Sequence, residues 1–153
     1  MRNKIFYVSA FLILALLLSS CTGGKPTVPE MPTDEELIRG VIKEFFSALS
    51  EQKWKLAKSK CVHGDNAYKL VDNLENVVAS LSYKCNNNVT LNYWPDITDI
   101  VIDGTDAHAH GYLAIVLKCD GQVDPNHSRA GNGDISLQKI GSNWKLLKME
   151  PIK

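Results

Sequence analysis

The hydrophobic pattern of this chain changes its period once, at Asn86-Asn87-Asn88, and that change limits the folds the chain can adopt. Upstream, apolar residues recur at helical spacing; downstream, they alternate with polar residues, as in half-buried strands. Helices that all precede the strands are typical of an α+β domain. We therefore expect N-terminal helices packed on one face of a curved antiparallel sheet.

The first helix is predicted to begin after Thr33. Thr33 and Glu36 have the spacing of a capping box, in which each side chain hydrogen-bonds a backbone N–H of the other residue. The acidic side chains of the first turn also suit the positive end of the helix dipole. A broad apolar stripe should then face the core, and it consists of Leu37, Ile38, Val41, Ile42, Phe45, Phe46 and Leu49.

Two further helices are expected before the change of period. A short one should start at Ser50 and carry Trp54, Leu56, Ala57 and Cys61. Gly64-Asp65 then ends that segment and begins a third helix. The apolar face of the third helix is formed by Ala67, Val71, Leu74, Val78 and Leu81.

Four antiparallel strands should follow, near residues 89–94, 113–117, 135–140 and 144–149. Asp103-Gly104 is predicted to be the two-residue turn of the first hairpin. A second tight turn, Gly141-Ser142-Asn143, should join the last two strands. The expected sheet is therefore a four-stranded meander.

Pairing the first hairpin without interruption would place its two apolar rows on opposite faces of the sheet. One extra residue near Pro95, a β-bulge, returns both rows to the inner face. The expected neighbours are then Leu113 with Tyr93, Ile115 with Leu91 and Leu117 with Val89.

The N-terminal segment has the pattern of a bacterial lipoprotein signal. Arg2 and Lys4 precede an apolar run over residues 5–18, and Ser19-Ser20 lie directly before Cys21. The alternative, a transmembrane anchor, is disfavoured because the run is shorter than the ~20 residues that span a bilayer. Residues 1–20 are thus predicted to be a signal peptide, and Cys21 the lipidated residue that attaches the protein to the lipid bilayer.

Residues 21–33 are rich in Pro and Gly and are expected to be a tether, followed by one domain over residues 34–153. The predicted location is the extracytoplasmic side of the cell envelope. Thr22 is not the Asp that retains lipoproteins in the inner membrane of some Gram-negative bacteria, which is compatible with the outer membrane. The signal peptide removes two basic residues and no acidic one, so the mature chain stays near neutral and offers no electrostatic footprint for nucleic acid.

Three cysteines remain after Cys21, so at most one intramolecular disulfide can form among them. The bulged register brings Cys119 within a diagonal of Cys85 on the same face of the sheet. Cys85–Cys119 is therefore the favoured pair, which leaves Cys61 as a free thiol. Cys61–Cys85 is the alternative.

A row of polar residues on the second strand is the candidate metal site. It consists of Asp106, His108, His110 and Tyr112, with Asp99 expected opposite His108. His108 and His110 are weak metal candidates, because two imidazoles alone do not complete a closed zinc site. A solvated outer face is the favoured interpretation. Residues 120–134 lack the spacing of a calcium loop and are expected to be a surface loop, so no metal and no cofactor is predicted.

Three segments resemble the nuclear-transport-factor-2-like, or cystatin-like, superfamily and its small lipoproteins of unknown function. They are residues 35–49, residues 54–57 and the closing Gly141-Ser142-Asn143-Trp144-Lys145-Leu146. The resemblance implies a cone-shaped fold with a pocket between the helices and the concave sheet face, and homodimers through the open face. Candidate pocket residues are Tyr93, Tyr68, Tyr83 and Phe45.

The resemblance does not imply a reaction, because the superfamily contains isomerases, dehydratases and proteins without known activity. The enzymes use a pocket Asp or His as base, and neither residue type falls on the inner rows of the predicted strands. No catalytic residue is therefore assigned. The favoured hypothesis is a tethered, non-catalytic module that binds an envelope protein or a small apolar ligand. The alternatives are a pocket enzyme of isomerase or dehydratase type and a metal-binding surface protein.

Overall fold

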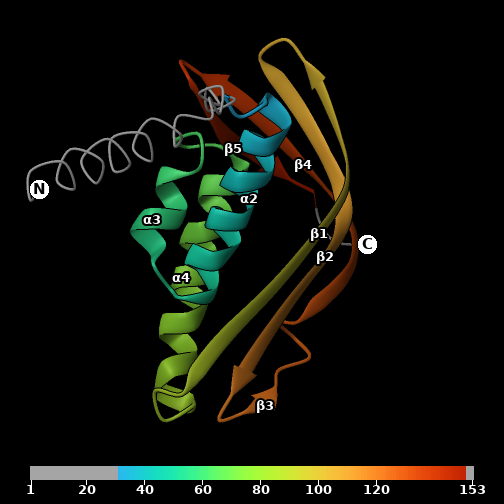
Figure 1. The fold of residues 1–153 in the computed structure, drawn as a ribbon. Coiled ribbons are helices and arrows are strands. Elements are labelled where there is room, and N and C mark those ends of the chain that lie inside the picture. The colour runs from blue at the N-terminus through green and yellow to red at the C-terminus, as the bar shows by residue number, and fades with distance from the viewer. Residues whose placement is uncertain (1–30, 151–153) are drawn as a thin grey trace, which may run out of the picture. The chain divides into compact units, whose positions relative to one another are not determined.

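A computed structural model describes residues 31–150, in which three helices precede five strands (Figure 1). The helices are α2 (Asp34–Ser50), α3 (Trp54–Ser59) and α4 (Asn66–Lys84). The strands are β1 (Val89–Asp103), β2 (Asp106–Cys119), β3 (Gln122–Val123), β4 (Arg129–Ile140) and β5 (Asn143–Met149). The predicted signal peptide, Cys21 and most of the tether lie outside the described residues. Within residues 31–150, no helix is both long enough and apolar enough to cross a membrane.

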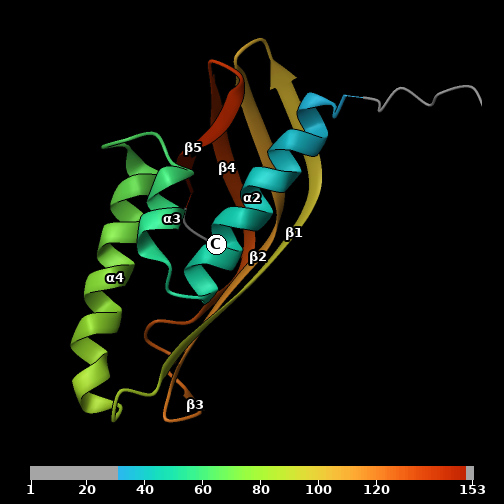
Figure 2. The ribbon, with the colours of Figure 1, turned by 60° about the vertical axis from the view of Figure 1, so that its left-hand side comes forward.

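The strands form one curved antiparallel sheet in the order β1-β2-β4-β5, and β3 pairs with the end of β2. The helices lie together on one face of this sheet, as the two views in Figures 1 and 2 show. The predicted α+β class is therefore confirmed. The short strand β3 is an addition to the expected four strands.

The start of α2 is fixed by the predicted capping box. The Glu36 N–H donates to Thr33 Oγ1 at 3.2 Å, and the Thr33 N–H donates to Glu36 Oε2 at 2.7 Å. Asp34 then joins this end of the helix to the β4–β5 hairpin, because its Oδ1 accepts from Lys139 Nζ at 2.7 Å and from Trp144 Nε1 at 2.9 Å. These hydrogen bonds lower the pKa of Asp34 below its ordinary value.

The core lies between the buried face of α2 and the inner face of the sheet. Phe45 at its centre has no exposed surface. The largest fully buried side chains around it are Ile38, Ile42, Leu49, Leu113, Leu117, Ile135, Leu137 and Leu146. The predicted stripe on α2 is correct except for Leu37, which is 39% exposed because it lies at the outer edge of the stripe.

The second helix differs from its prediction. It begins at Trp54 rather than Ser50, because Gln52 adopts a left-handed backbone with φ of 54° and turns the chain out of α2. Leu56 faces outward, and Cys61 lies after the helix, in a short parallel bridge with Leu146 of β5. The third helix has the expected buried residues Ala67, Val71 and Val78, whereas Leu74 and Leu81 are half-buried.

The first hairpin has the predicted inner face with different partners. Its turn residues are Gly104 and Thr105, since Asp103 pairs with Asp106. Gly104 has φ of 60°, which suits glycine at the first position of such a turn. The bulge occurs at Thr98 rather than near Pro95.

The shifted turn displaces the expected partners of residues 89–93 by two residues, whereas the new position of the bulge leaves those partners unchanged. Tyr93 lies opposite Ile115, Leu91 opposite Leu117 and Val89 opposite Cys119. Because strand side chains alternate with a period of two, both rows still face inward.

Two glycines permit close packing where the sheet bends. Gly111 of β2 pairs with Ile97 just before the Thr98 bulge and with Gly133 of β4 on its other side. A Cβ atom on Gly111 would clash with the carbonyl oxygen of Asp96, and one on Gly133 would lie 2.7 Å from Leu113 Cδ1. The bend therefore depends on the absence of side chains at these two positions.

The C-terminal end of α4 is covalently attached to the sheet. Cys85, at the helix end, and Cys119 of β2 form a disulfide with a Cα–Cα distance of 5.1 Å. This is the pair favoured by the sequence, and Cys61 is free and buried. The expected surface loop over residues 120–134 is partly wrong, because it contains β3 and the first half of β4. Asp120 and Gly121 form the tight turn before β3, both with positive φ.

We expect Gly111→Ala and Gly40→Ala to have opposite effects on stability. The methyl group at position 111 meets backbone atoms and should lower the free energy of unfolding by at least ~1–3 kcal/mol. At position 40, within α2, a Cβ atom meets nothing within 4 Å, so alanine should raise the free energy of unfolding by about 0.5–1 kcal/mol. Urea denaturation of both variants tests this, and a Gly111→Ala protein as stable as the wild type would contradict it.

Candidate functional site

An open cleft of about 540 Å³ lies between α4 and the sheet. Helix α4 contributes Asn66, Lys69, Leu70 and Asn73 to its lining, and the opposite wall is formed by Ile115, Arg129, Met149 and Glu150. These residues come from α4, β2, β4 and the end of β5, which are distant in sequence. Its volume is in the range of small-molecule sites.

Helix α4 is attached at both ends of the cleft region. At its start, Asn66 Oδ1 accepts a hydrogen bond from the Met149 N–H of β5 at 3.2 Å. At its end, the Cys85–Cys119 disulfide holds it to β2. Between these points the apolar row Leu70, Leu74, Val77 and Leu81 lies along one helix face and is only half-buried. The helix therefore presents apolar surface that the sheet does not fully cover.

The floor of the cleft is apolar and its rim is charged. Leu70, Ile115 and Met149 supply the apolar surface. Lys69 and Arg129 stand on opposite walls, one on the helix and one at the first residue of β4. Within residues 31–150 neither cation has a carboxylate partner, whereas Glu150 is paired with Lys148.

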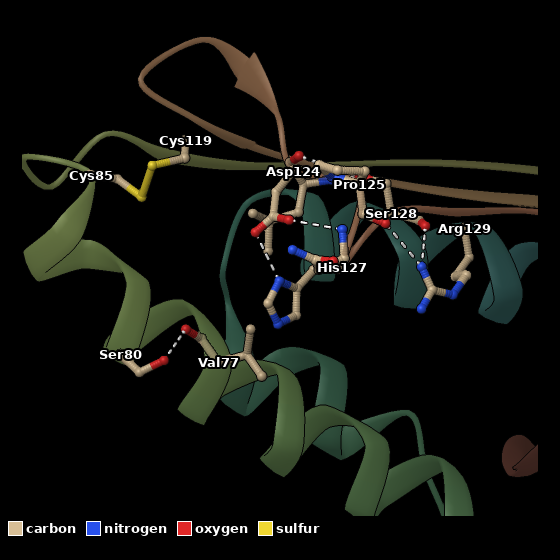
Figure 3. A network of polar contacts seen from close by, with 11 residues as sticks. Val77, Ser80, Cys85, Cys119, Asp124, Pro125, His127, Ser128 and Arg129 are labelled. Carbon is tan, nitrogen blue, oxygen red and sulfur yellow. Dashed lines mark hydrogen bonds and ion pairs between the residues drawn. A yellow bond between two sulfur atoms is a disulfide. The ribbon is translucent and has the colours of Figure 1, made fainter.

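The loop between β3 and β4 orients two side chains beside this region. Arg129 Nη1 donates to the carbonyl oxygens of Ser128 at 2.7 Å and Pro125 at 3.1 Å. His127 Nδ1 lies 2.8 Å from Asp124 Oδ2. Figure 3 shows the His127 imidazole and the Arg129 guanidinium pointing from the loop toward the helix side of the sheet.

Hydrogen bonds hold this loop in place and set the charge of Asp124. The Leu117 N–H of β2 donates to Ser128 Oγ at 3.1 Å, and the Asn126 N–H donates to Asp124 Oδ1 at 2.9 Å. The hydrogen bonds from His127 and from the Asn126 amide lower the pKa of Asp124 below its ordinary value. The carboxylate is therefore ionised and orients the imidazole.

The pocket residues expected from the resemblance lie elsewhere. Phe45 is a core residue, Tyr83 is 92% exposed, and Tyr68 stacks on His63 with ring centroids 4.8 Å apart. Tyr93 packs against Phe46 at 5.5 Å, beneath α2. None of these residues lines the cleft beside α4.

Tyr93 has an unusual environment for a tyrosine. It is 8% exposed, and its buried hydroxyl has no hydrogen-bond partner among the described residues. Burial raises the pKa of Tyr93 well above its ordinary value, so the phenol stays neutral near neutral pH. Its cross-strand neighbour is Ile115, which lines the cleft.

The candidate metal residues lie on the outer face of the sheet. Asp106, His108, His110 and Tyr112 are all exposed. His110 Nδ1 pairs with Asp134 Oδ1 at 2.7 Å. Asp99 lies opposite His110 rather than His108, because the turn is formed by Gly104 and Thr105 instead of Asp103 and Gly104. In the described part of the chain, no three His, Cys, Asp or Glu side chains are grouped so that they could hold a metal ion.

Sequence reasoning missed Arg129 and His127, because both lie in a stretch expected to be a surface loop. The Asp124-Pro125-Asn126-His127 segment does carry a signal, since an Asp that accepts from the N–H two residues on forms a local turn. That turn brings the imidazole back to the carboxylate. No sequence motif identifies Lys69 and Asn73 as cleft residues, because their role depends only on which face of α4 they occupy.

Comparison with known proteins identifies the fold. No family model and no curated protein matches the sequence. Among solved structures, the β subunit of benzoate 1,2-dioxygenase from Burkholderia mallei is 12% identical, with a TM-score of 0.61 over 78% of this chain and 90% of that one. An NTF2-like protein with a cystatin-like fold from Novosphingobium aromaticivorans is 11% identical, with a TM-score of 0.56 over 98% of this chain and 90% of that one.

A third solved structure, Aln2 from a Streptomyces species, is 8% identical, with a TM-score of 0.59 over 78% of this chain and 91% of that one. At such low identity these likenesses define the fold alone. The domain has the fold of the nuclear-transport-factor-2-like, or cystatin-like, proteins, as the resemblance predicted.

Replacing Tyr93 with Phe should stabilise the domain. The substitution removes a buried hydroxyl without a partner among the described residues and keeps the aromatic packing against Phe46. We expect the free energy of unfolding to rise by about 1 kcal/mol, measured by chemical denaturation. A loss of stability would mean that the hydroxyl has a partner that the described contacts do not include.

Proposed function

We propose that this protein is an extracytoplasmic lipoprotein, anchored to the membrane through acylated Cys21, whose domain is a non-catalytic binding module. The observation that carries the proposal is the cleft beside α4, which combines an apolar floor with an open, charged rim. Its ligand is a small molecule with an apolar part, either free or carried by a partner in the envelope. The Pro- and Gly-rich tether of residues 21–33 gives the domain reach from the bilayer surface.

The filled core beneath α2 supports binding rather than catalysis. Phe45, Phe46 and Tyr93 are buried beneath α2, and the Phe46 ring packs against both Phe45 and Tyr93. Among residues 31–150 the buried side chains include no charged group. A general base needs a hydrogen-bonded, partly desolvated position beside the substrate, and the cleft lining supplies only Glu150, which is already paired with Lys148.

The anchor is tested by fatty-acid labelling in cells. Cys21→Ser should abolish incorporation of a labelled fatty acid and release the protein from the membrane fraction, because two or more acyl chains are needed for firm attachment. Cys61→Ser, which removes a buried thiol within the domain, should keep the label. Labelling of the Cys21→Ser protein would refute the anchor.

The cleft is tested with N-phenyl-1-naphthylamine, a neutral apolar fluorophore whose emission rises in an apolar site. Asn73→Trp places an indole in the cleft and should weaken binding of the probe at least tenfold. Asn76→Trp is the matched control, because Asn76 is exposed on the same helix and does not line the cleft. Equal binding by both variants would place the site elsewhere.

The second candidate is a pocket enzyme of isomerase or dehydratase type, and the Asp124–His127 pair favours it. The carboxylate holds Nδ1 of the imidazole, which leaves Nε2 available as a proton acceptor. If this candidate holds, a screen of small hydroxy and keto compounds should find turnover that His127→Gln removes. Binding without turnover supports the first candidate.

A further inference from the structure

We propose that the cleft takes an amphiphile with one apolar chain and a single carboxylate head group. This inference rests on the proposed function, because it assigns a ligand class to the same cleft. Three observations carry it: two cations without counter-ions among the described residues, an apolar floor that continues along α4, and the limited volume of the cleft.

Lys69 and Arg129 provide the head-group site. They project from opposite walls of the cleft, and neither has a carboxylate partner within residues 31–150. None of the nine ion pairs in that part of the chain includes either of them. Because both cations line the same cleft, an anion bound in the cleft is attracted by both of them.

Arg129 is prepared for a planar anion. Two backbone carbonyls of its own loop fix the Nη1 group, which leaves the Nε and Nη2 donors unused in the described structure. A guanidinium with a fixed orientation loses little side-chain entropy when it binds, and its parallel donors match the two oxygens of a carboxylate. Lys69, on the facing helix, adds a second and more mobile donor.

The apolar part of the ligand follows the helix. Leu70, Ile115 and Met149 form the floor next to the cations. The half-buried side chains Leu74, Val77 and Leu81 continue the same face of α4 toward the disulfide. Burying a chain here removes apolar surface from water at about 25 cal/mol per Å².

Size and charge narrow the ligand further. A cleft of about 540 Å³ suits one chain and not a two-chain phospholipid. Glu150 stands on the same rim and disfavours a doubly charged phosphate ester, even though Lys148 offsets part of its charge. A carboxylate carries the single negative charge that the rim accommodates.

Calorimetric titration of the purified protein with octanoate, octanol and octyl phosphate tests the proposal. Octanoate should bind at least about tenfold more tightly than octanol, which has the same chain and no charge. In the Lys69→Gln, Arg129→Gln double variant this preference should disappear, because octanoate loses the two charged partners of its carboxylate. Lys84→Gln, on the exposed end of the same helix, is the charge-matched control and should keep the preference.

The outcomes separate the ligand class from the binding site. Equal affinity for octanoate and octanol overturns the carboxylate assignment and leaves the cleft as an apolar binding site. The carboxylate assignment is also overturned if the double variant still prefers octanoate to octanol, or if octyl phosphate binds more tightly than octanoate. If none of the three compounds binds and the fluorophore does not bind either, the proposed function fails as well. All substituted side chains are exposed, so circular dichroism should show an unchanged fold.

Discussion

The packing of α2 against the concave face of the sheet is the contact on which the rest of the domain depends. Its buried face, centred on Phe45, belongs to one core cluster with side chains from every long strand. Removing water from that much apolar surface is the main favourable contribution to folding. Because the capping box and the Asp34 contacts set where α2 begins, they also set which residues enter this core.

The packing of α2 against the sheet also requires that the sheet be curved. A flat sheet could contact a single helix only along a narrow line, whereas a bent one wraps around it. The bulge at Thr98 and the facing glycines at positions 111 and 133 produce the bend in the first three long strands. The same bend directs the far end of β2 toward the C-terminal end of α4, where the disulfide joins them.

Much of this fold was predictable because it follows from local patterns. The capping box needs only residues 33–36, and the inner face of each strand follows from a period of two. That period explains why the faces were right although the partners were wrong: a displacement by two residues keeps every side chain on its side. The turn position at Gly104, the bulge at Thr98 and the start of α3 depend on how whole strands and helices meet, which no short pattern records.

The candidate site was harder to predict than the core for the same reason. Its residues come from one helix face and from three separated strands, and they are polar or half-buried rather than strictly periodic. Tyr93 and Phe45 were candidate pocket residues because the resemblance implies a pocket between the helices and the concave sheet face, and both are buried on that side of the sheet. Arg129 looked like part of a surface loop, since its position at the start of β4 requires pairing with Ile115.

Helix α4 is held to the sheet at both ends: near its start Asn66 accepts a hydrogen bond from the Met149 N–H of β5, and at its C-terminal end Cys85 is bonded covalently to Cys119. A helix held at both ends can bend in its middle, but neither end can move away from the sheet. The width of the cleft can therefore change through a small bend in the middle of α4, but not through a rotation of the whole helix away from the sheet. Reduction of the Cys85–Cys119 disulfide would leave the C-terminal end of α4 held to the sheet by noncovalent contacts alone.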